Sequence, residues 1–224
     1  MRLIQIAIDG PGGAGKSTIA KMLAEKLGFL YIDSGAMYRA ITYVAIENEV
    51  SCNDEEELAR LAAETEIDFM IADTGKQLVI CNGLDVTALI RNPRISKKVS
   101  LVSQHPGVRR ILVEKQQDLA EKRDVVMDGR DIGTVVLPKA ECKIFLTASL
   151  AERARRRYME FLGKGYAQEY DTIRAELERR DTLDANREVG PLRQACDAVV
   201  IDTTCLGLQD VVTKIMKIYE QKKG

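Results

Sequence analysis

The stretch Gly10-Pro11-Gly12-Gly13-Ala14-Gly15-Lys16-Ser17 decides the fold of this chain, because it fits the pattern G-x-x-x-x-G-K-[ST]. Residues 3–8 before it form a mostly apolar run of strand length. Residues 16–27 after it place apolar side chains on one helical face and stop at Gly28. Strand, glycine loop and helix together are typical of a phosphate-binding P-loop, and the alternative is a glycine-rich turn without a ligand.

The residue types of this loop indicate its chemistry. Glycines let backbone N–H groups converge on an anion, and the helix N-terminus adds partial positive charge. Lys16 can reach the β- and γ-phosphates of a nucleoside triphosphate, and the Ser17 hydroxyl can bind Mg²⁺. The predicted nucleotide-binding residues are Gly10, Pro11, Gly12, Gly13, Ala14, Gly15, Lys16, Ser17 and Thr18.

The composition of the whole chain argues against several classes of protein. Its 224 residues can hold one core and a small inserted subdomain, and the net charge of −1 does not favour nucleic acid or an anionic membrane. No apolar run approaches the length of a membrane span, and residues 1–8 are too short for a signal peptide. Five scattered cysteines and one histidine do not suggest a zinc site, so we expect reduced thiols in a cytoplasmic protein.

Alternating apolar strands and helices predict an α/β fold with a doubly wound core. Besides the first strand, we expect buried strands at residues 29–32, 125–127, 143–146 and 198–201. Helical spacing of apolar residues fills residues 36–46, 108–121, 150–161, 171–181 and 208–219. Ligands are then expected at the carboxyl ends of the strands.

One region breaks this alternation. Residues 65–70, 77–81 and 83–86 have the pattern of short antiparallel strands, with a turn at Asp73-Thr74-Gly75. We therefore expect a P-loop core from residues 1–36 and 101–224, and an inserted subdomain from residues 37–100.

Two further clusters of polar residues follow expected strands. Asp128 ends an apolar run, as in the Walker B pattern that holds Mg²⁺, although many buried strands end in Asp at a turn. Ser34 and Arg39 begin the helix after residue 33 and could bind a second anion, or Asp33 and Ser34 could simply cap that helix.

Arginines crowd two helical segments. Arg153, Arg155, Arg156 and Arg157 repel one another unless anions neutralise them, so they form either a solvated basic face or a lid over a transferring phosphoryl group. Arg180, Asp184 and Arg187 are spaced as one polar stripe, which is either a salt-bridge ladder or a phosphate and sugar site that Arg109 could join. His105 precedes Pro106, and we expect it to pack in a loop rather than to act in catalysis.

With these motifs in place, the chain resembles the bacterial cytidylate kinases, a family of the nucleoside monophosphate kinase superfamily. The resemblance runs almost end to end and rests on residues 8–17, 33–39, 128–134 and 143–149, and on Arg180-Asp181-x-x-Asp184-x-x-Arg187. It implies a P-loop NTPase-type core with a five-stranded parallel sheet. It also implies a nucleoside monophosphate (NMP)-binding domain enlarged by a short antiparallel sheet, and a short helical lid at about residues 153–168.

The resemblance also implies roles for individual residues. Ser100, Arg109 and Asp131 correspond to residues that recognise cytosine, whereas Arg180 and Asp184 correspond to the pair that holds the ribose hydroxyls. The monophosphate ligands would be Ser34, Arg39, Arg130 and Arg187, with Tyr38 packing nearby. The catalytic residues would be Lys16, Arg130, Arg153 and Arg157, and the Mg²⁺ ligands would be Ser17 and Asp128. This chain has Leu183 and Ala185 where some members carry another arginine or serine.

The resemblance implies a kinase that transfers the γ-phosphoryl group of ATP to CMP or dCMP, in pyrimidine nucleotide metabolism. We expect it to work as a monomer, without nucleic acid or membrane partners. A kinase of the same fold could act on another monophosphate or a small metabolite. A GTPase switch would need an N-K-x-D segment, which the sequence lacks, and a nucleic-acid-dependent ATPase would be expected to carry excess positive charge.

Overall fold

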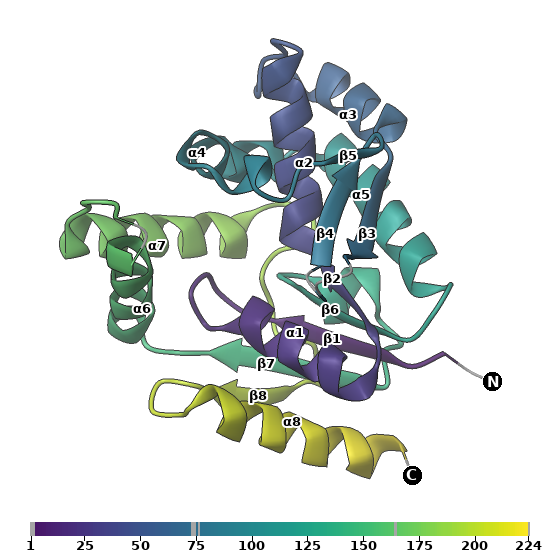
Figure 1. The fold of residues 1–224 in the computed structure, drawn as a ribbon, viewed down its shortest axis with the longest axis vertical. Coiled ribbons are helices and arrows are strands. Elements are labelled where there is room, and N and C mark those ends of the chain that lie inside the picture. Colours follow the sequence, from purple (N-terminus) through teal and green to yellow (C-terminus); the bar gives the residue numbers. More distant parts are fainter. Residues whose placement is uncertain (1–2, 73–74, 76, 164, 224) are drawn as a thin grey trace. The chain divides into compact units, whose positions relative to one another are not determined.

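The computed structural model describes residues 3–72, 75, 77–163 and 165–223 (Figure 1). The chain divides into two compact units. The core unit comprises Met1–Tyr31 and Lys122–Gly224, and the second unit comprises Ile32–Glu121.

The core unit alternates strands and helices as the sequence predicts. Its elements are β1 (Gln5–Asp9), α1 (Lys16–Leu27), β2 (Leu30–Asp33, which ends in the second unit), β6 (Val125–Gly129), the π-helical turn η2 (Ile132–Val136), β7 (Cys142–Thr147), α6 (Leu150–Gly163), α7 (Tyr170–Asn186), β8 (Val199–Asp202) and α8 (Leu208–Lys223).

A five-stranded sheet in the order β2-β6-β1-β7-β8 organises these elements. Strand β1 pairs in parallel with both β6 and β7, and β7 pairs in parallel with β8. The register aligns Asp9 with Gly129 and Thr147 with Asp202, so the strands end at one edge of the sheet. The segments that follow β1, β6, β7 and β8 therefore begin at the same edge, where an open α/β sheet binds its ligands.

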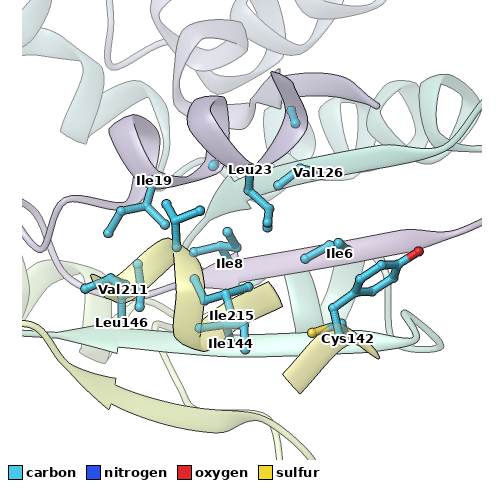
Figure 2. Packing of buried hydrophobic residues seen from close by; sticks show 14 of the residues in the cluster. Ile6, Ile8, Ile19, Leu23, Val126, Cys142, Ile144, Leu146, Val211 and Ile215 are labelled. Atoms are coloured by element: carbon cyan, nitrogen blue, oxygen red, sulfur yellow. The ribbon is translucent and has the colours of Figure 1, made fainter. Parts of the chain in front are cut away.

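Apolar side chains of alternate strand positions pack against α1 and α8 (Figure 2). Ile6 and Ile8 of β1 are fully buried, as are Leu23 of α1 and Ile215 of α8. Each such side chain contributes about 1.5–3 kcal/mol through removal from water. This packing holds β1 and α1 rigidly on either side of the glycine loop.

The second unit contains a small antiparallel sheet and several helices. Its elements are α2 (Ser34–Glu47), α3 (Glu55–Glu64), β3 (Ile67–Ile71), β4 (Gln77–Cys81), β5 (Leu84–Asp85), the 3-10 helix η1 (Leu89–Arg91), α4 (Pro93–Val102) and α5 (Pro106–Ala120). Strand β4 pairs antiparallel with both β3 and β5. Asp73 and Thr74 of the predicted turn lie outside the described residues.

The second unit spans more residues than the predicted insertion at residues 37–100, because helix α5 packs against α3. The Gly107 amide donates to the Glu55 carboxylate at 2.9 Å, and Lys115 Nζ donates to the carbonyls of Ala63 and Thr65 at 3.1 and 3.0 Å. These contacts join residues about fifty positions apart, which local sequence patterns do not reveal.

The predicted α/β class is confirmed, including the five-stranded parallel sheet and the separate short antiparallel sheet. One local expectation is wrong. Arg187 does not continue the polar stripe of Arg180 and Asp184 on a helix, because α7 ends at Asn186 and Arg187 has extended backbone angles. Among the helices of the described residues, none is both long enough and apolar enough to cross a bilayer.

Candidate active site

The loop between β1 and α1 is shaped by its glycines. A Cβ at Gly10 would lie 1.9 Å from the backbone carbonyl oxygen of Leu146, so only glycine fits beside β7. Gly15 occupies the N-cap of α1 at φ 89° and offers no capping side chain. The first amides of α1 therefore remain available for an anion, as the sequence predicts for a phosphate cradle.

Lys16 lies inside this loop. Its Nζ donates to the carbonyl of Pro11 at 2.8 Å, and the residue is only 5% exposed. Burial and the neighbouring positive charge of Arg130 lower the pKa of Lys16 below its usual range, while Asp128 opposes that shift. A bound phosphate would favour the charged ammonium for the same electrostatic reason that Asp128 does.

Ser17 and Asp128 bring two oxygen ligands together. The Ser17 hydroxyl donates to Asp128 at 2.9 Å, and the Tyr31 hydroxyl donates to the other oxygen of that carboxylate at 2.7 Å. A hydroxyl and one carboxylate fit Mg²⁺, which usually takes few protein ligands and completes its octahedron with water and phosphate oxygens. The described residues contain no group of three or more His, Cys, Asp or Glu side chains that could hold a metal ion.

Asp9 is a buried carboxylate that the sequence analysis left without a role. Its two oxygens accept the backbone N–H groups of Ile132 and Gly133 at 2.8 and 2.7 Å. Asp9 thus ties the end of β1 to η2, directly after Arg130 and Asp131. Burial raises the pKa of Asp9 to about 6 despite these two hydrogen bonds. A charged residue ending an otherwise apolar strand was the sequence signal for this tether.

Three arginines surround Asp184 in the core unit. Arg130 Nε donates to Asp184 at 2.7 Å, and Arg187 and Arg180 approach the same carboxylate at 3.7 and 4.0 Å. Arg187 also lies 3.5 Å from Asp131. Burial opposes ionisation of Asp184, but the three arginines hold its pKa below the usual range. Three guanidinium groups thus converge on one carboxylate, and guanidinium groups are well suited to binding a phosphate with two hydrogen bonds.

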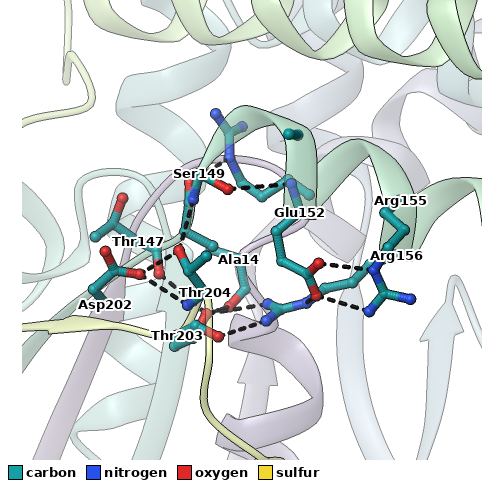
Figure 3. Close-up of polar contacts among 12 residues, drawn as sticks. Ala14, Thr147, Ser149, Glu152, Arg155, Arg156, Asp202, Thr203 and Thr204 are labelled. Atoms are coloured by element: carbon teal, nitrogen blue, oxygen red, sulfur yellow. Dashed lines mark hydrogen bonds and ion pairs between the residues drawn. The ribbon is translucent and has the colours of Figure 1, made fainter.

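The arginines of α6 pair with carboxylates of this chain, and two of them share one carboxylate. Arg153 is 6% exposed and donates to Asp181 at 2.6 Å and to the Gly12 carbonyl at 3.1 Å. Arg155 and Arg156 both bind Glu152, as Figure 3 shows. Side-chain hydrogen bonds from these arginines hold the pKa of Glu152 at about 2.

Arg157 differs from the buried Arg153. Its Nη1 donates to Glu160 at 2.9 Å, its guanidinium lies 4.6 Å from the ring centre of Phe161, and its side chain is 40% exposed. Each of the four arginines therefore has a carboxylate partner that sequence reasoning did not identify. These partners are Asp181, Glu152 and Glu160. These partners lie up to 28 positions away, so counting adjacent charges did not find all of them.

The second unit holds the remaining predicted site residues. Asp33 accepts the Ala36 amide at 2.9 Å, which confirms a capping role, and it also accepts Arg39 Nη2 at 2.7 Å. Ser34 begins α2 and is buried. Arg39 therefore lies beside the first turn of α2, where the free amides of a helix favour an anion.

Arg109 and Tyr38 lie together in the second unit. Arg109 is 1% exposed, lies 5.4 Å from the ring centre of Tyr38, and donates to the Ser103 carbonyl at 3.2 Å. Ser100 lies on α4, and its backbone carbonyl accepts the Ser103 hydroxyl at 3.1 Å. His105 contacts the Cys52 carbonyl at 2.8 Å, as expected of a histidine packed in a loop.

The structure thus gathers Lys16, Ser17 and Asp128 around the P-loop, and Arg130, Asp131, Arg180, Asp184 and Arg187 in one charged cluster of the same unit. Within the second unit it joins Arg39 to the start of α2, and Tyr38 to Arg109. It does not bring Arg157 into the cluster of Arg153 and Asp181. Asp9, Tyr31, Glu152 and Asp181 are partners that sequence reasoning missed.

Comparison with known proteins gives consistent matches over nearly the whole chain. The model of the cytidylate kinase family matches residues 6–221. A cytidylate kinase of Bacillus subtilis (strain 168) is 55% identical over 219 residues, covering 98% of this chain and 97% of that protein. A cytidylate kinase of Geobacillus sp. (strain WCH70) is 51% identical over 221 residues, covering 99% of this chain and 98% of that protein.

Among solved structures, an uncharacterized protein from Eubacterium ventriosum ATCC 27560 has a TM-score of 0.52 and 15% identity, covering 98% of this chain and 99% of that one. At this identity the similarity supports the fold alone.

Proposed function

The chain belongs to the cytidylate kinase family, and on that premise we propose that the residues described above carry the transfer of the γ-phosphoryl group of ATP to CMP or dCMP. The protein is an enzyme of the (d)CMP kinase class. The observation that best supports the site assignment is the cluster of Arg130, Arg180 and Arg187 in the same unit as the P-loop.

The reaction needs alignment and charge neutralisation more than proton transfer. A phosphate monoester carries close to two negative charges at neutral pH, because its second pKa is about 6. The acceptor is therefore already nucleophilic, and no general base is needed. Lys16 would bind the donor phosphates, where burial among positive neighbours strengthens its preference for a negative ligand.

Mg²⁺ would be held by Ser17 and Asp128, and it would neutralise charge on the phosphates of ATP. The 2.9 Å contact between these side chains supports this pairing. Tyr31 would orient the Asp128 carboxylate through its 2.7 Å hydrogen bond. Pro11, Gly12 and Thr18 would complete the contacts of the loop with the triphosphate.

In the core unit, Arg130 and Arg187 would bind the phosphate of CMP, and Arg180 and Asp184 would hold its ribose. Asp131 would accept the exocyclic amine of cytosine, a group that uracil lacks. Asp184 contacts Arg130, and Asp131 contacts Arg187. These contacts support the proposal that the side chains that bind phosphate, ribose and base orient one another.

In the second unit, Ser34 and Arg39 would contribute to binding of the monophosphate, with Tyr38 packing nearby. Arg109 and Ser100 would recognise the base. Burial of Arg109 against Tyr38 supports a fixed guanidinium rather than a solvated one. We also propose that residues 37–100 form the NMP-binding insertion and that residues 1–36 and 101–224 form the P-loop core. This insertion is shorter than the second unit, which also contains Ser34 and Arg109.

The lid assignment separates Arg153 from Arg157. Arg153 would act through the P-loop, because it binds the Gly12 carbonyl. Arg157 would approach the transferred phosphoryl group only after leaving Glu160. We further propose a monomer, since one chain supplies every residue assigned here, and a reducing cytoplasmic setting, since Cys196 and Cys205 are exposed free thiols.

The experiment that tests the reaction is product identification. Purified protein is incubated with Mg²⁺, CMP and ATP labelled at the γ-phosphate, and the products are separated. We expect the label in CDP and unlabelled ADP. Label released as inorganic phosphate at the same rate with and without CMP would contradict the proposal.

A further inference from the structure

Thr203 is a buried hydroxyl residue that follows β8 and has no role in the proposed reaction. It is 2% exposed, and its hydroxyl lies 3.2 Å from the Ala14 carbonyl oxygen and 3.0 Å from the Thr147 carbonyl oxygen. One hydroxyl carries one proton, so the two carbonyls share it. Thr147 also accepts the backbone N–H of Thr203 at 2.8 Å and keeps a donor without the hydroxyl.

Arg156 fixes Thr203 from the other side. Its Nη1 donates to the Thr203 hydroxyl at 3.1 Å, and its Nη2 donates to the Thr203 carbonyl at 2.6 Å. Glu152 holds Arg156 Nε at 2.9 Å (Figure 3). Because Arg156 donates to the hydroxyl oxygen, the hydroxyl proton is directed toward the two carbonyls, and a charged donor strengthens the bond that the proton makes.

The neighbouring Thr204 connects the same segment to another element, the start of α6. Its hydroxyl accepts the Ser149 amide at 2.9 Å and bonds to Asp202 at 2.5 Å. Ser149 in turn accepts the amide of Glu152 at 3.2 Å and caps the start of α6. The segment after β8 is thus tied to the start of α6 by Thr204 and to the P-loop by Thr203.

The position of Ala14 gives the Thr203 contact a consequence for the P-loop. A peptide unit is planar and trans, so the Ala14 carbonyl and the Gly15 N–H point in opposite directions. Gly15 has φ 89° and lacks a side chain, so it does little to prevent this peptide from rotating. A hydrogen bond that holds the Ala14 carbonyl therefore also aims the Gly15 N–H.

We propose that Thr203, held by Arg156, is a positioning residue that aims the Gly15 N–H at the donor phosphates. Thr203 does not touch the nucleotide in this account; it acts through the Ala14–Gly15 peptide. The inference rests on the proposed role of the P-loop in binding the donor. Loss of the hydroxyl weakens binding of any polyphosphate in the loop, with or without a base.

The test compares Thr203→Val with Thr203→Ser in the full chain. Valine keeps the shape of threonine but lacks the hydroxyl, whereas serine retains it. Binding of ATP and of inorganic tripolyphosphate, each with Mg²⁺, is measured by calorimetry. Since one hydrogen bond contributes on the order of fivefold to an equilibrium, we expect Thr203→Val to weaken both ligands by about fivefold. Thr203→Ser should restore most of that loss, and KM for CMP should stay within about twofold.

Thr204→Val is the matched control, because it removes a hydroxyl one position away that bonds to the start of α6. It should change tripolyphosphate binding by less than about twofold. Selective ¹⁵N-glycine labelling adds a direct readout: the Gly15 amide resonance should shift in Thr203→Val and return in Thr203→Ser. If Thr203→Val does not fold, Arg156→Lys replaces it, since a lysine cannot reproduce the two-pronged contact, and about threefold weaker tripolyphosphate binding is expected.

Three results would overturn the inference. They are unchanged polyphosphate binding in the variant, a loss confined to ATP with tripolyphosphate unaffected, and a serine variant that behaves like valine. Measurements on the wild-type protein distinguish a failure of this inference from a failure of the proposed function. Wild-type protein that binds tripolyphosphate without phosphorylating CMP would refute the proposed function alone.

Discussion

The Ser17 hydroxyl donates a 2.9 Å hydrogen bond to the carboxylate of Asp128, joining the first turn of α1 to the end of β6. Residues 111 positions apart in the sequence thus face each other at the point where the sheet ends. Tyr31 holds the second oxygen of the same carboxylate at 2.7 Å. The pair presents two oxygen ligands with a fixed orientation, as a Mg²⁺–phosphate site requires.

Asp128→Asn should raise the Mg²⁺ concentration needed for half-maximal activity by about tenfold or more, because it replaces a charged ligand with a neutral one. Activity is measured across a Mg²⁺ titration at saturating ATP and CMP. Tyr31→Phe is the control, since it removes a hydrogen bond to the carboxylate but keeps the charge, and it should shift the titration much less. Equal shifts in the two variants would contradict direct binding of Mg²⁺ by Asp128.

Lys16→Met should lower turnover by orders of magnitude and leave CMP binding largely intact, since the lysine is assigned to the donor phosphates. Burial and Arg130 depress the lysine pKa in the free protein, whereas a bound triphosphate favours the ammonium. ATP binding at mildly alkaline pH should therefore take up protons, as calorimetry in buffers of different ionisation enthalpy reports. Equal proton uptake by Lys16→Met would show that another group titrates.

Asp9 should make folding stability fall as pH rises from about 4 to about 6. Its pKa is raised to about 6 in the folded protein, above the value of about 3.9 usual for an unfolded chain. The native state therefore holds this proton more tightly, and its stabilising effect is lost through that window. The free energy of unfolding of the wild type minus that of Asp9→Asn should decrease by about 2–3 kcal/mol. A difference that is flat with pH would contradict the assignment.

Arg153→Ala should destabilise the core unit by about 3 kcal/mol, because it leaves Asp181 without its 2.6 Å partner and removes a donor to Gly12. Arg157→Ala should change the free energy of unfolding by about 0.5 kcal/mol or less, since its pair with Glu160 is exposed. Urea unfolding measures both. Similar losses of unfolding free energy in the two variants would contradict the assignment of a stabilising role to Arg153.

Asp131→Ala should reduce the preference for CMP over UMP, because a carboxylate can accept from the amine that only cytosine carries. The ratio of kcat/KM for the two acceptors measures this preference. Asp131 also lies 3.5 Å from Arg187, so some loss of kcat/KM for both acceptors is expected. An unchanged ratio would remove Asp131 from base recognition.

The core strands, the P-loop and the antiparallel insert could be predicted because their signals are local. Gly10 to Ser17 specify the loop, and apolar runs specify the strands on either side of it. Asp128 could be proposed as a Walker B residue because it ends such a run, and its hydrogen bond with Ser17 supports that interpretation.

What sequence reasoning missed depends on contacts between distant residues. Asp9 binds amides 123 and 124 positions away, and Arg153 finds Asp181 on α7. The end of α7 before Arg187 had no strong stop signal, because neither glycine nor proline occupies that position. The spacing of apolar residues ended the expected helix at residue 181, before its actual end at Asn186, whereas the spacing of charges carried the polar stripe on to Arg187. Neither pattern revealed the carboxylate partners of the arginines in α6.

The acceptor of this kinase can be identified by measuring ADP production with ATP and Mg²⁺. CMP, dCMP, UMP, AMP and GMP are offered in parallel, with a control that lacks any acceptor. We predict the fastest turnover with CMP or dCMP and little ADP without an acceptor. Fastest turnover with another monophosphate would overturn the base-recognition residues but keep the P-loop chemistry. ADP production that is independent of the acceptor would show that this protein is not a CMP kinase.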